Sequence, residues 1–166
     1  MKILQAVAQD LVEVLFLLKE SVTDLNEKGL KHWNSAYPGT DYMIEAIEKG
    51  TLYLYKDNEI AKGLVVLSND EPEEYRNIEW QGKGDKVLFI RFLMIHPNWE
   101  RTGIASRLIE YAEGYAKDNG YSTMRVDMYS GVEGAEKLCT DKGFNQTGQF
   151  HSSFQQTPYF AYEKSL

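Results

Sequence analysis

The chain has 166 residues, 43% of them apolar, and carries 18 basic against 25 acidic side chains, a net charge of −7. This size and composition indicate one globular domain over residues 1–166 and exclude a disordered chain. Nucleic acid and anionic membranes bind basic surfaces, so the acidic balance argues against both as partners and suits a cationic substrate.

The cysteine content and the apolar runs bear on the compartment. The one cysteine, Cys139, cannot form an internal disulfide, which fits a reducing compartment. The apolar run at residues 14–18 is far shorter than the ~20 residues of a membrane-spanning helix. Because Asp10 and Glu13 interrupt the apolar stretch, no signal peptide is expected. We therefore expect a cytoplasmic protein.

The first part of the chain predicts a strand followed by two helices. Residues 2–7 are expected as the strand, and Asp10 can cap the helix that follows. Apolar residues then recur at helical spacing on one face, and these are Leu11, Val14, Leu15, Leu18, Val22 and Leu25. Gly29 ends that helix, and a second helix is expected between Thr40 and Gly50.

The middle of the chain predicts three strands. Residues 51–55 and 60–67 flank a turn and are expected to pair. Residues 68–86 form a long polar connection rich in acidic side chains. The strongly apolar residues 87–95 form the third strand, which ends before Pro97 because proline cannot continue a central ladder.

In the last part of the chain, helical spacing returns at Gly103 and predicts a helix that ends at Gly120. A strand is expected at residues 122–128, a helix at 131–142, and two final strands that begin at Phe144 and Pro158. The predicted order is a strand, two helices, three strands, a helix, a strand, a helix and two strands. This order indicates a mixed α/β sheet with helices on its faces and no second domain.

Residues 93–106 are the most informative segment, where a buried strand ends, a short loop turns and a helix begins. The first N–H groups of a helix lack internal partners and lie at the positive end of its dipole, so they can bind phosphates. Gly103 allows a ligand to approach the backbone, and Arg101 adds a cation. A plain strand-to-helix turn is equally compatible with this segment alone.

Other signatures of cofactor chemistry are missing. The sequence has no phosphate loop, no G-x-G-x-x-G after a strand and no H-E-x-x-H. His32, His96 and His151 are too far apart for ligand spacing, so no metal site is expected. Ser130 lacks the preceding glycine that a nucleophile elbow requires.

The whole chain resembles the GCN5-related N-acetyltransferase (GNAT) superfamily in the order of its elements. Residues 93–106 resemble that family's acetyl-CoA motif, Q/R-x-x-G-x-G/A. The second motif of the family is similar to the set Ala135, Leu138, Lys142, Gly143 and Phe144, and Trp33 with Tyr37-Pro38 resembles a W-x-x-x-Y-P loop of one subgroup. The resemblance implies a mixed, mostly antiparallel sheet of about seven strands with helices on both faces.

The resemblance also implies acetyl-CoA as co-substrate and where it binds. The backbone of Leu93 and Ile95 would pair with the pantetheine arm, and the helix around Ala135 would lie along it. The pyrophosphate would be held by backbone N–H groups of Arg101, Thr102, Gly103, Ile104, Ala105 and Ser106.

Three positions depart from the family pattern. Glu100 stands where Gln or Arg is usual, and an anion there does not favour a pyrophosphate. Val132 stands where Asn is common. Cys139 stands where the family has the tyrosine that protonates the departing CoA thiolate.

The implied reaction is direct acetyl transfer to the amine of a small molecule or a peptide. Cys139 and Tyr129 are candidate proton donors and Glu79 is a candidate base, each with the alternative of a packing or solvated side chain. Trp33, Tyr37 and Tyr159 can line an acceptor pocket, with aromatic core as the alternative.

Three other functions remain open. Because of its departures, the chain can be a non-catalytic acyl-CoA-binding sensor of the same fold. A module for another phosphate ligand and an enzyme that uses the Cys139 thiol are the other two. The sequence does not reveal the acceptor, the acyl length or the oligomeric state, and a homodimer is compatible with it.

Overall fold

The computed structural model describes residues 1–82, 84–152 and 156–166. The elements are β1 (Lys2–Gln5), α1 (Leu11–Glu27), α2 (Thr40–Glu48), β2 (Leu52–Asp57), β3 (Ile60–Ser68), η2 (Glu73–Asn77), β4 (Val87–Ile95), η3 (Pro97–Trp99), α3 (Ile104–Asp118), β5 (Thr123–Tyr129), α4 (Ala135–Asp141), β6 (Asn145–Phe150) and β7 (Tyr159–Ser165), with a short 3₁₀ turn, η1 (Ala8–Asp10), before α1. The strands pair in the order β1-β2-β3-β4-β5-β7-β6.

The expected fold class is confirmed. The β4–β5 pair is parallel, whereas the β1–β2, β2–β3, β5–β7 and β6–β7 pairs are antiparallel. The chain divides into two compact units, one of Met1–Leu67 with Phe92–Leu108 and one of Ser68–Arg91 with Ile109–Leu166. This division does not test the expectation of a single domain over residues 1–166, which stays a prediction.

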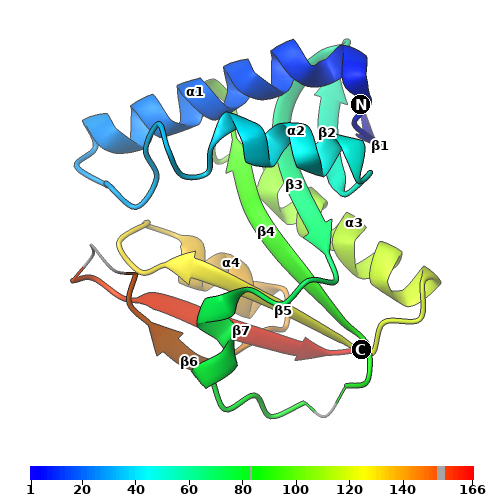
Figure 1. Ribbon diagram of the computed structural model, residues 1–166, viewed down its shortest axis with the longest axis vertical. Helices are drawn as coiled ribbons and strands as arrows, with labels where there is room; N and C mark the ends of the chain where they lie inside the picture. The colour runs from blue at the N-terminus through cyan, green and yellow to red at the C-terminus, as the bar shows by residue number, and fades with distance from the viewer. Residues whose placement is uncertain (83, 153–155) are drawn as a thin grey trace. The chain divides into compact units, whose positions relative to one another are not determined.

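In the first unit, α1 and α2 pack together over the hairpin of β2 and β3 (Figure 1). Val14, Leu17 and Leu18 of α1 and Met43 of α2 are buried in its core with Leu54 of β2. Burying each such side chain contributes about 1.5–3 kcal/mol. The α1 face was predicted only in part, because Leu17 is fully buried while Leu11 and Leu25 are not.

Gly63 of β3 lies close to the first turn of α3 in the same unit. A Cβ at Gly63 would lie 3.0 Å from Ile104 Cγ2 and 3.0 Å from Ile95 Cδ1. Contacts this short are tighter than nearly all real Cβ contacts, so a side chain at this position would push the neighbouring groups away, whereas glycine lets the helix start approach the strand closely. The sequence gives no reason to single out this glycine, whose role depends on residues about forty positions away.

In the second unit, α4 packs on β5, and the strands β5, β7 and β6 form an antiparallel ladder beside the first half of β4 (Figure 1). The β4–β5 pairs run from Val87↔Thr123 to Ile90↔Val126. The long polar connection 68–86 contains η2, whose Tyr75 is 0% exposed.

Two local expectations were wrong. Asp10 does not cap α1 with its side chain, because its carboxylate accepts a hydrogen bond from the Val7 N–H and pairs with Lys56 at 2.8 Å. The fourth helix begins at Ala135 rather than near residue 131, since Gly134 adopts a left-handed φ of 84° that ends the preceding turn. In the described residues, no helix is both long enough and apolar enough to span a membrane.

Candidate functional site

The turn that joins β4 to α3 is tightly bonded within itself. The Asn98 N–H donates to His96 Nδ1 at 3.1 Å, and the Thr102 hydroxyl donates to the Trp99 carbonyl at 2.5 Å. Arg101 and Gly103 then take the left-handed φ values of 59° and 87°. Two such residues so close together bend the backbone sharply, and at Gly103 the absence of a Cβ makes the bend free of strain.

This turn leaves a run of backbone donors without protein partners. In the described parts of the chain, no acceptor is found for the N–H groups of Thr102, Gly103, Ile104, Ala105 and Ser106. All five belong to the loop end or the first turn of α3, where the helix dipole adds positive potential. Such a set of donors fits a diphosphate, and the role predicted for the N–H groups of residues 101–106 in holding one stays a prediction.

Glu100, which departs from the family pattern, is paired with a cation. Its carboxylate forms an ion pair with Lys28 at 3.2 Å, next to the Lys28–Asp24 pair at 2.7 Å. The Glu100 side chain is 41% exposed, so solvent also screens it. The fold thus offsets the departure at this position with a cation that lies 72 residues earlier in the sequence.

Phe92 in the middle of β4 is strained. It has a φ of 49°, which is rare for a bulky residue in a strand. Its ring is held by Trp33, Tyr37 and Tyr42, with centroids 6.1, 5.4 and 4.8 Å away. Strain of this kind often marks functional backbone, and the sequence carried no signal of it.

Trp33 and Tyr37, predicted for an acceptor pocket, are therefore brought together on Phe92. Asn34 fixes their loop, since its side-chain oxygen accepts from the N–H groups of Ala36 and Tyr37. Tyr37 is 44% exposed, whereas Trp33 is half-buried. The two rings can contact a ligand, and their role in binding an acceptor stays a prediction.

The predicted residues of β4 are half-buried. Leu93 and Ile95 both alternate with the buried Phe92 and Met94. The carbonyl of Ile95 accepts from the Ser21 hydroxyl at 3.5 Å, and the next N–H, of His96, donates to Lys62. The pairing of Leu93 and Ile95 with a pantetheine arm stays a prediction.

Cys139 lies on the inner face of α4 and is 0% exposed. Burial raises the pKa of its thiol to about 12, and the neighbouring charge of Asp127 acts in the same direction. A thiol in this setting is a poor acid and a poor nucleophile. The geometry favours packing over the donor role, which stays an untested prediction. Ala135, predicted beside the cofactor, is buried at the start of the same helix.

Tyr129 and Tyr159 pair across β5 and β7, with ring centroids 5.1 Å apart. Both are buried, and Phe150 stacks on Tyr159 at 5.1 Å. Glu79 is exposed, next to a Trp80 ring that packs on Tyr75. Tyr129 and Tyr159 thus lie together, whereas nothing in the described structure links Glu79 to them.

The same unit contains a carboxylate that the sequence reasoning missed. The Tyr75 hydroxyl donates to Asp127 Oδ1 at 2.5 Å. Burial raises the pKa of the Asp127 carboxyl, while the Tyr75 hydrogen bond and the charge of Arg91 oppose that rise. The one available signal was an acidic residue inside a mostly buried strand, Thr123–Tyr129.

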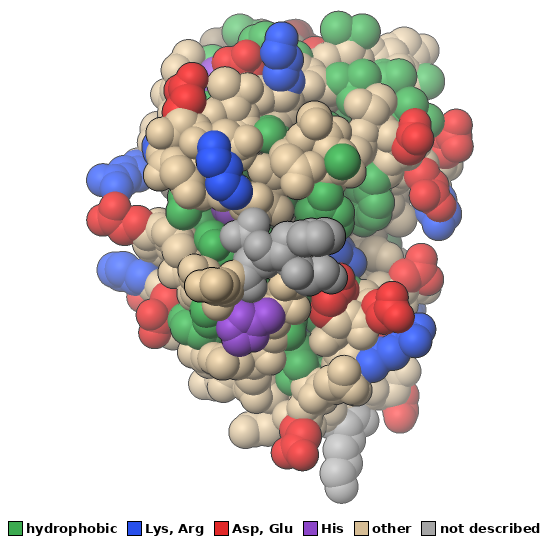
Figure 2. Space-filling view, turned by 60° about the vertical axis from the view of Figure 1, so that its left-hand side comes forward, with side chains coloured by type: hydrophobic (Ala, Val, Ile, Leu, Met, Phe, Trp, Pro, Cys, Tyr) green, Lys and Arg blue, Asp and Glu red, His purple; other side chains and the backbone are tan. Residues whose placement is uncertain are grey.

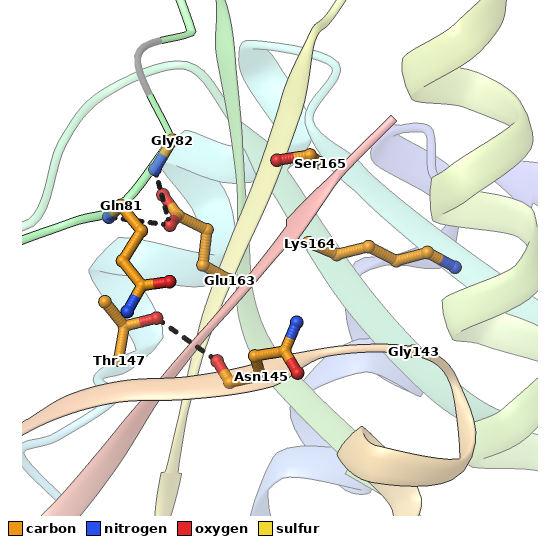
Figure 3. Close-up of a pocket in the computed structure, with 8 residues that line it drawn as sticks. All are labelled: Gln81, Gly82, Gly143, Asn145, Thr147, Glu163, Lys164 and Ser165. Carbon is orange, nitrogen blue, oxygen red and sulfur yellow. Dashed lines mark hydrogen bonds between the residues drawn. The ribbon is translucent and has the colours of Figure 1, made fainter.

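A polar pocket of about 280 Å³ opens over β6 and β7, lined by Gln81, Gly82, Gly143, Asn145, Thr147, Glu163, Lys164 and Ser165 (Figure 3). The Glu163 carboxylate is satisfied by the N–H groups of Gln81 and Gly82 and by Arg125. Figure 3 shows Lys164 pointing away from this carboxylate. None of the residues predicted for the site lines this pocket.

The charged side chains on one face of the molecule can be followed in Figure 2. On the face drawn in Figure 2, Asp and Glu side chains are scattered, and the Lys and Arg side chains stand apart from one another. In the described residues, no group of His, Cys, Asp and Glu side chains has the arrangement of a metal site.

Comparison with known proteins places this geometry in context. The model of the acetyltransferase (GNAT) family matches residues 18–144. No curated protein matches the sequence significantly.

Many solved structures share the fold. An acetyltransferase of the GNAT family from Streptococcus agalactiae superposes with a TM-score of 0.83 at 15% identity, over 99% of this chain and 95% of that one. A ribosomal-protein-alanine N-acetyltransferase from Brucella melitensis gives 0.75 at 15% identity, over 100% of both chains. The yncA protein of Salmonella typhimurium, solved with its cofactor acetyl-CoA, gives 0.73 at 16% identity, over 99% and 93%. At these identities the likeness establishes the fold alone.

Proposed function

Because the chain belongs to the acetyltransferase (GNAT) family, we propose that it transfers the acetyl group of acetyl-CoA to an amine by direct attack. The observation that carries the proposal is the run of unpartnered N–H groups from Thr102 to Ser106. These donors fit the diphosphate of CoA, and the Lys28 pair holds the Glu100 carboxylate in place.

Acetyl-CoA supplies an activated thioester, and the chain supplies position and electrostatics. The loop N–H groups hold the diphosphate, and Arg101 adds a cation beside them. The backbone of Leu93 and Ile95 on β4 is proposed to align the pantetheine arm. Alignment of two reactants contributes up to roughly 7–11 kcal/mol to lowering a barrier, so positioning can provide much of the catalysis.

The acceptor is proposed to be a small-molecule or peptide amine. Trp33 and Tyr37 each contact the Phe92 ring. Together they provide aromatic surface, which attracts cations. The chain's charge of −7 further favours a cationic substrate over a nucleic acid or a membrane. A cytoplasmic setting remains our expectation from the single cysteine.

Calorimetry with acetyl-CoA, combined with release of the CoA thiol on addition of amines, tests the proposal. We expect acetyl-CoA to bind, ATP not to compete, and thiol release to depend on an amine. A protein with no measurable affinity for CoA or acetyl-CoA would refute it.

A non-catalytic acyl-CoA sensor is the second candidate. The burial of Cys139, where the family has a tyrosine acid, favours it because the chain then lacks the usual proton donor. Binding of acetyl-CoA without turnover on any amine would select the sensor.

A further inference from the structure

The polar pocket over β6 and β7 lies entirely within the second unit (Figure 3). Its cavity of about 280 Å³ is lined by the loop before β4, the turn before β6, and the two strands themselves. None of the residues proposed for acetyl transfer lines it. The pocket is therefore a cavity to which the proposed function gives no role.

The pocket lies where the ladder between β6 and β7 opens. The last pair of this ladder is Asn145↔Glu163, whereas β7 continues to Ser165. The N–H of the next residue, Leu166, donates to the Ser122 carbonyl on the β5 side. Because backbone groups alternate in direction along a strand, those of Ser165 face the β6 side, where no described residue pairs with them. One backbone donor and one acceptor are thus left for a ligand.

The floor of the pocket is the buried Glu163 side chain, which is 5% exposed. Its Oε1 accepts from the N–H groups of Gln81 at 3.0 Å and Gly82 at 2.8 Å. Its Oε2 accepts from Arg125 Nε at 2.9 Å, and Arg125 also donates to the Gly82 carbonyl. Both carboxylate oxygens are satisfied, so Glu163 fixes the loop on β7 and does not call for a cationic ligand.

The Lys164 ammonium is satisfied as well. It donates to Glu113 Oε2 at 2.6 Å and to the Lys142 carbonyl at 2.8 Å. Figure 3 shows the Lys164 side chain extending away from the Glu163 carboxylate. Since the acid and the base that line the pocket each have opposite charges as partners, the pocket favours neither anions nor cations.

The remaining polar side chains of the pocket are neutral. Gln81 and Asn145 each provide a carboxamide, for which no hydrogen bond is found in the described parts of the chain. Thr147 and Ser165 provide hydroxyl groups, and the Thr147 hydroxyl donates to the Asn145 carbonyl at 3.2 Å. A carboxamide offers donors and an acceptor, and a hydroxyl oxygen accepts while it donates. The pocket thus presents donors and acceptors together.

The ligand class follows from these groups. A ligand with donors alone or acceptors alone would leave half of them unsatisfied, which costs free energy. Hydroxyl groups on neighbouring carbons both donate and accept, so they match the pocket. None of the eight lining residues is aromatic, so a flat nucleobase would find no ring to stack on. Cavities for drug-sized ligands begin near ~300 Å³, and a smaller cavity suits a single sugar ring.

We propose that this pocket binds a small uncharged polyol, a single sugar ring, through the carboxamides of Gln81 and Asn145 and the backbone of Ser165. The site is separate from the proposed acetyl transfer, because the two share no residue. Hydrogen bonds to such a ligand replace hydrogen bonds to water, so the affinity is expected to be in the millimolar range.

Nuclear magnetic resonance of the ¹⁵N-labelled protein tests the site, since it reports on the Ser165 N–H and on the side-chain NH₂ groups of Gln81 and Asn145 individually. The protein is titrated with D-glucose, D-galactose and myo-inositol, each up to roughly 100 mM, which is well above a millimolar Kd. Spermidine and inorganic phosphate serve as charged probes. We expect at least one of the three polyols to shift these signals saturably, and more strongly than either charged probe.

Asn145→Ala and Gln81→Ala remove one carboxamide each from exposed positions, so both variants should fold. Loss of a neutral hydrogen bond should weaken polyol binding roughly 2- to 10-fold in each. Gln149→Ala is the matched control, because it removes an exposed carboxamide from the same strand without lining the pocket. This control should bind the polyol like the wild type.

Three results would overturn the proposal. The first is the absence of saturable shifts at Gln81, Asn145 and Ser165 with all three polyols. The second is an affinity that Asn145→Ala and Gln81→Ala leave unchanged, which would place the polyol elsewhere. The third is a stronger saturable response to spermidine or phosphate than to any polyol, which would mean that the pocket selects charge. None of these readouts depends on acetyl-CoA, so failure here leaves the proposed function intact.

Discussion

Two regions of the molecule present their polar groups in opposite ways. The loop from Thr102 to Ser106 offers backbone N–H groups, which are present whatever side chains the sequence carries. The Asp127 region offers one carboxylate held by one buried phenol. A backbone site therefore tolerates a departure such as Glu100, whereas a side-chain site depends on single atoms.

The two units also contain titratable groups whose pKa values burial shifts in opposite directions. In the first unit, burial lowers the pKa of His32 to about 4. In the second, burial raises the pKa of Asp127. Burial disfavours the charged form in both cases, so acid should destabilise the fold through His32, and base should do so through Asp127.

The largest change in the free energy of unfolding is expected when the Tyr75 side chain, which donates a hydrogen bond to Asp127, is removed. Tyr75→Ala removes a fully buried ring and should reduce the free energy of unfolding by about 3–5 kcal/mol. Tyr75→Phe, which keeps the ring, should cost only about 0.5–1.5 kcal/mol for the hydrogen bond. Urea titrations measure both, and equal losses would mean that the hydroxyl rather than the ring holds this region.

The next largest effect is the pH dependence of stability that His32 causes in the first unit. His32 is 7% exposed, and its folded pKa of about 4 lies below the ordinary value of 6.5. Its neutral form should therefore stabilise the fold above pH 6.5, and this contribution should fall by about 1.4 kcal/mol per pH unit down to pH 4. His32→Gln should remove that slope in urea titrations between pH 4 and 7, and an unchanged slope would show that other groups cause it.

A smaller change in stability should distinguish Gly103, which precedes α3, from Gly114, which lies inside this helix. Gly103→Ala should lose about 1–2 kcal/mol of stability, because a Cβ is strained at a φ of 87°, and acetyl-CoA should bind more weakly. Gly114→Ala, in the helix interior with open space around it, should gain about 0.5–1 kcal/mol. Urea titration and calorimetry check both, and a Gly103→Ala protein with unchanged stability and affinity would count against the backbone site.

The smallest effect is expected at Glu100. Glu100→Gln removes an anion near the loop and should strengthen acetyl-CoA binding about two- to fivefold, from roughly 0.3–1 kcal/mol of dipole and charge interaction. Lys28→Gln breaks the same ion pair but leaves the anion, so affinity should fall slightly. Calorimetry at low salt measures both, and equal changes in the two variants would contradict this account.

Much of the fold was readable from local patterns. The bounds 87–95 of β4 were predicted as observed, because a long apolar run ends at a proline. The start of α4 was predicted four residues too early, since nothing local reveals the left-handed turn at Gly134. The loop at Gly103 was recognised because glycine spacing is a local feature, whereas Asp127 looked like an ordinary strand residue.

The sequence by itself determined the order of the elements and the backbone turn before α3, because periodicity, glycine and proline act within a few residues. Only the tertiary structure decided that Lys28 pairs with Glu100 and that Tyr75 donates to Asp127. These pairs join residues 72 and 52 positions apart, and such distances are closed only when the packing of the core fixes the chain.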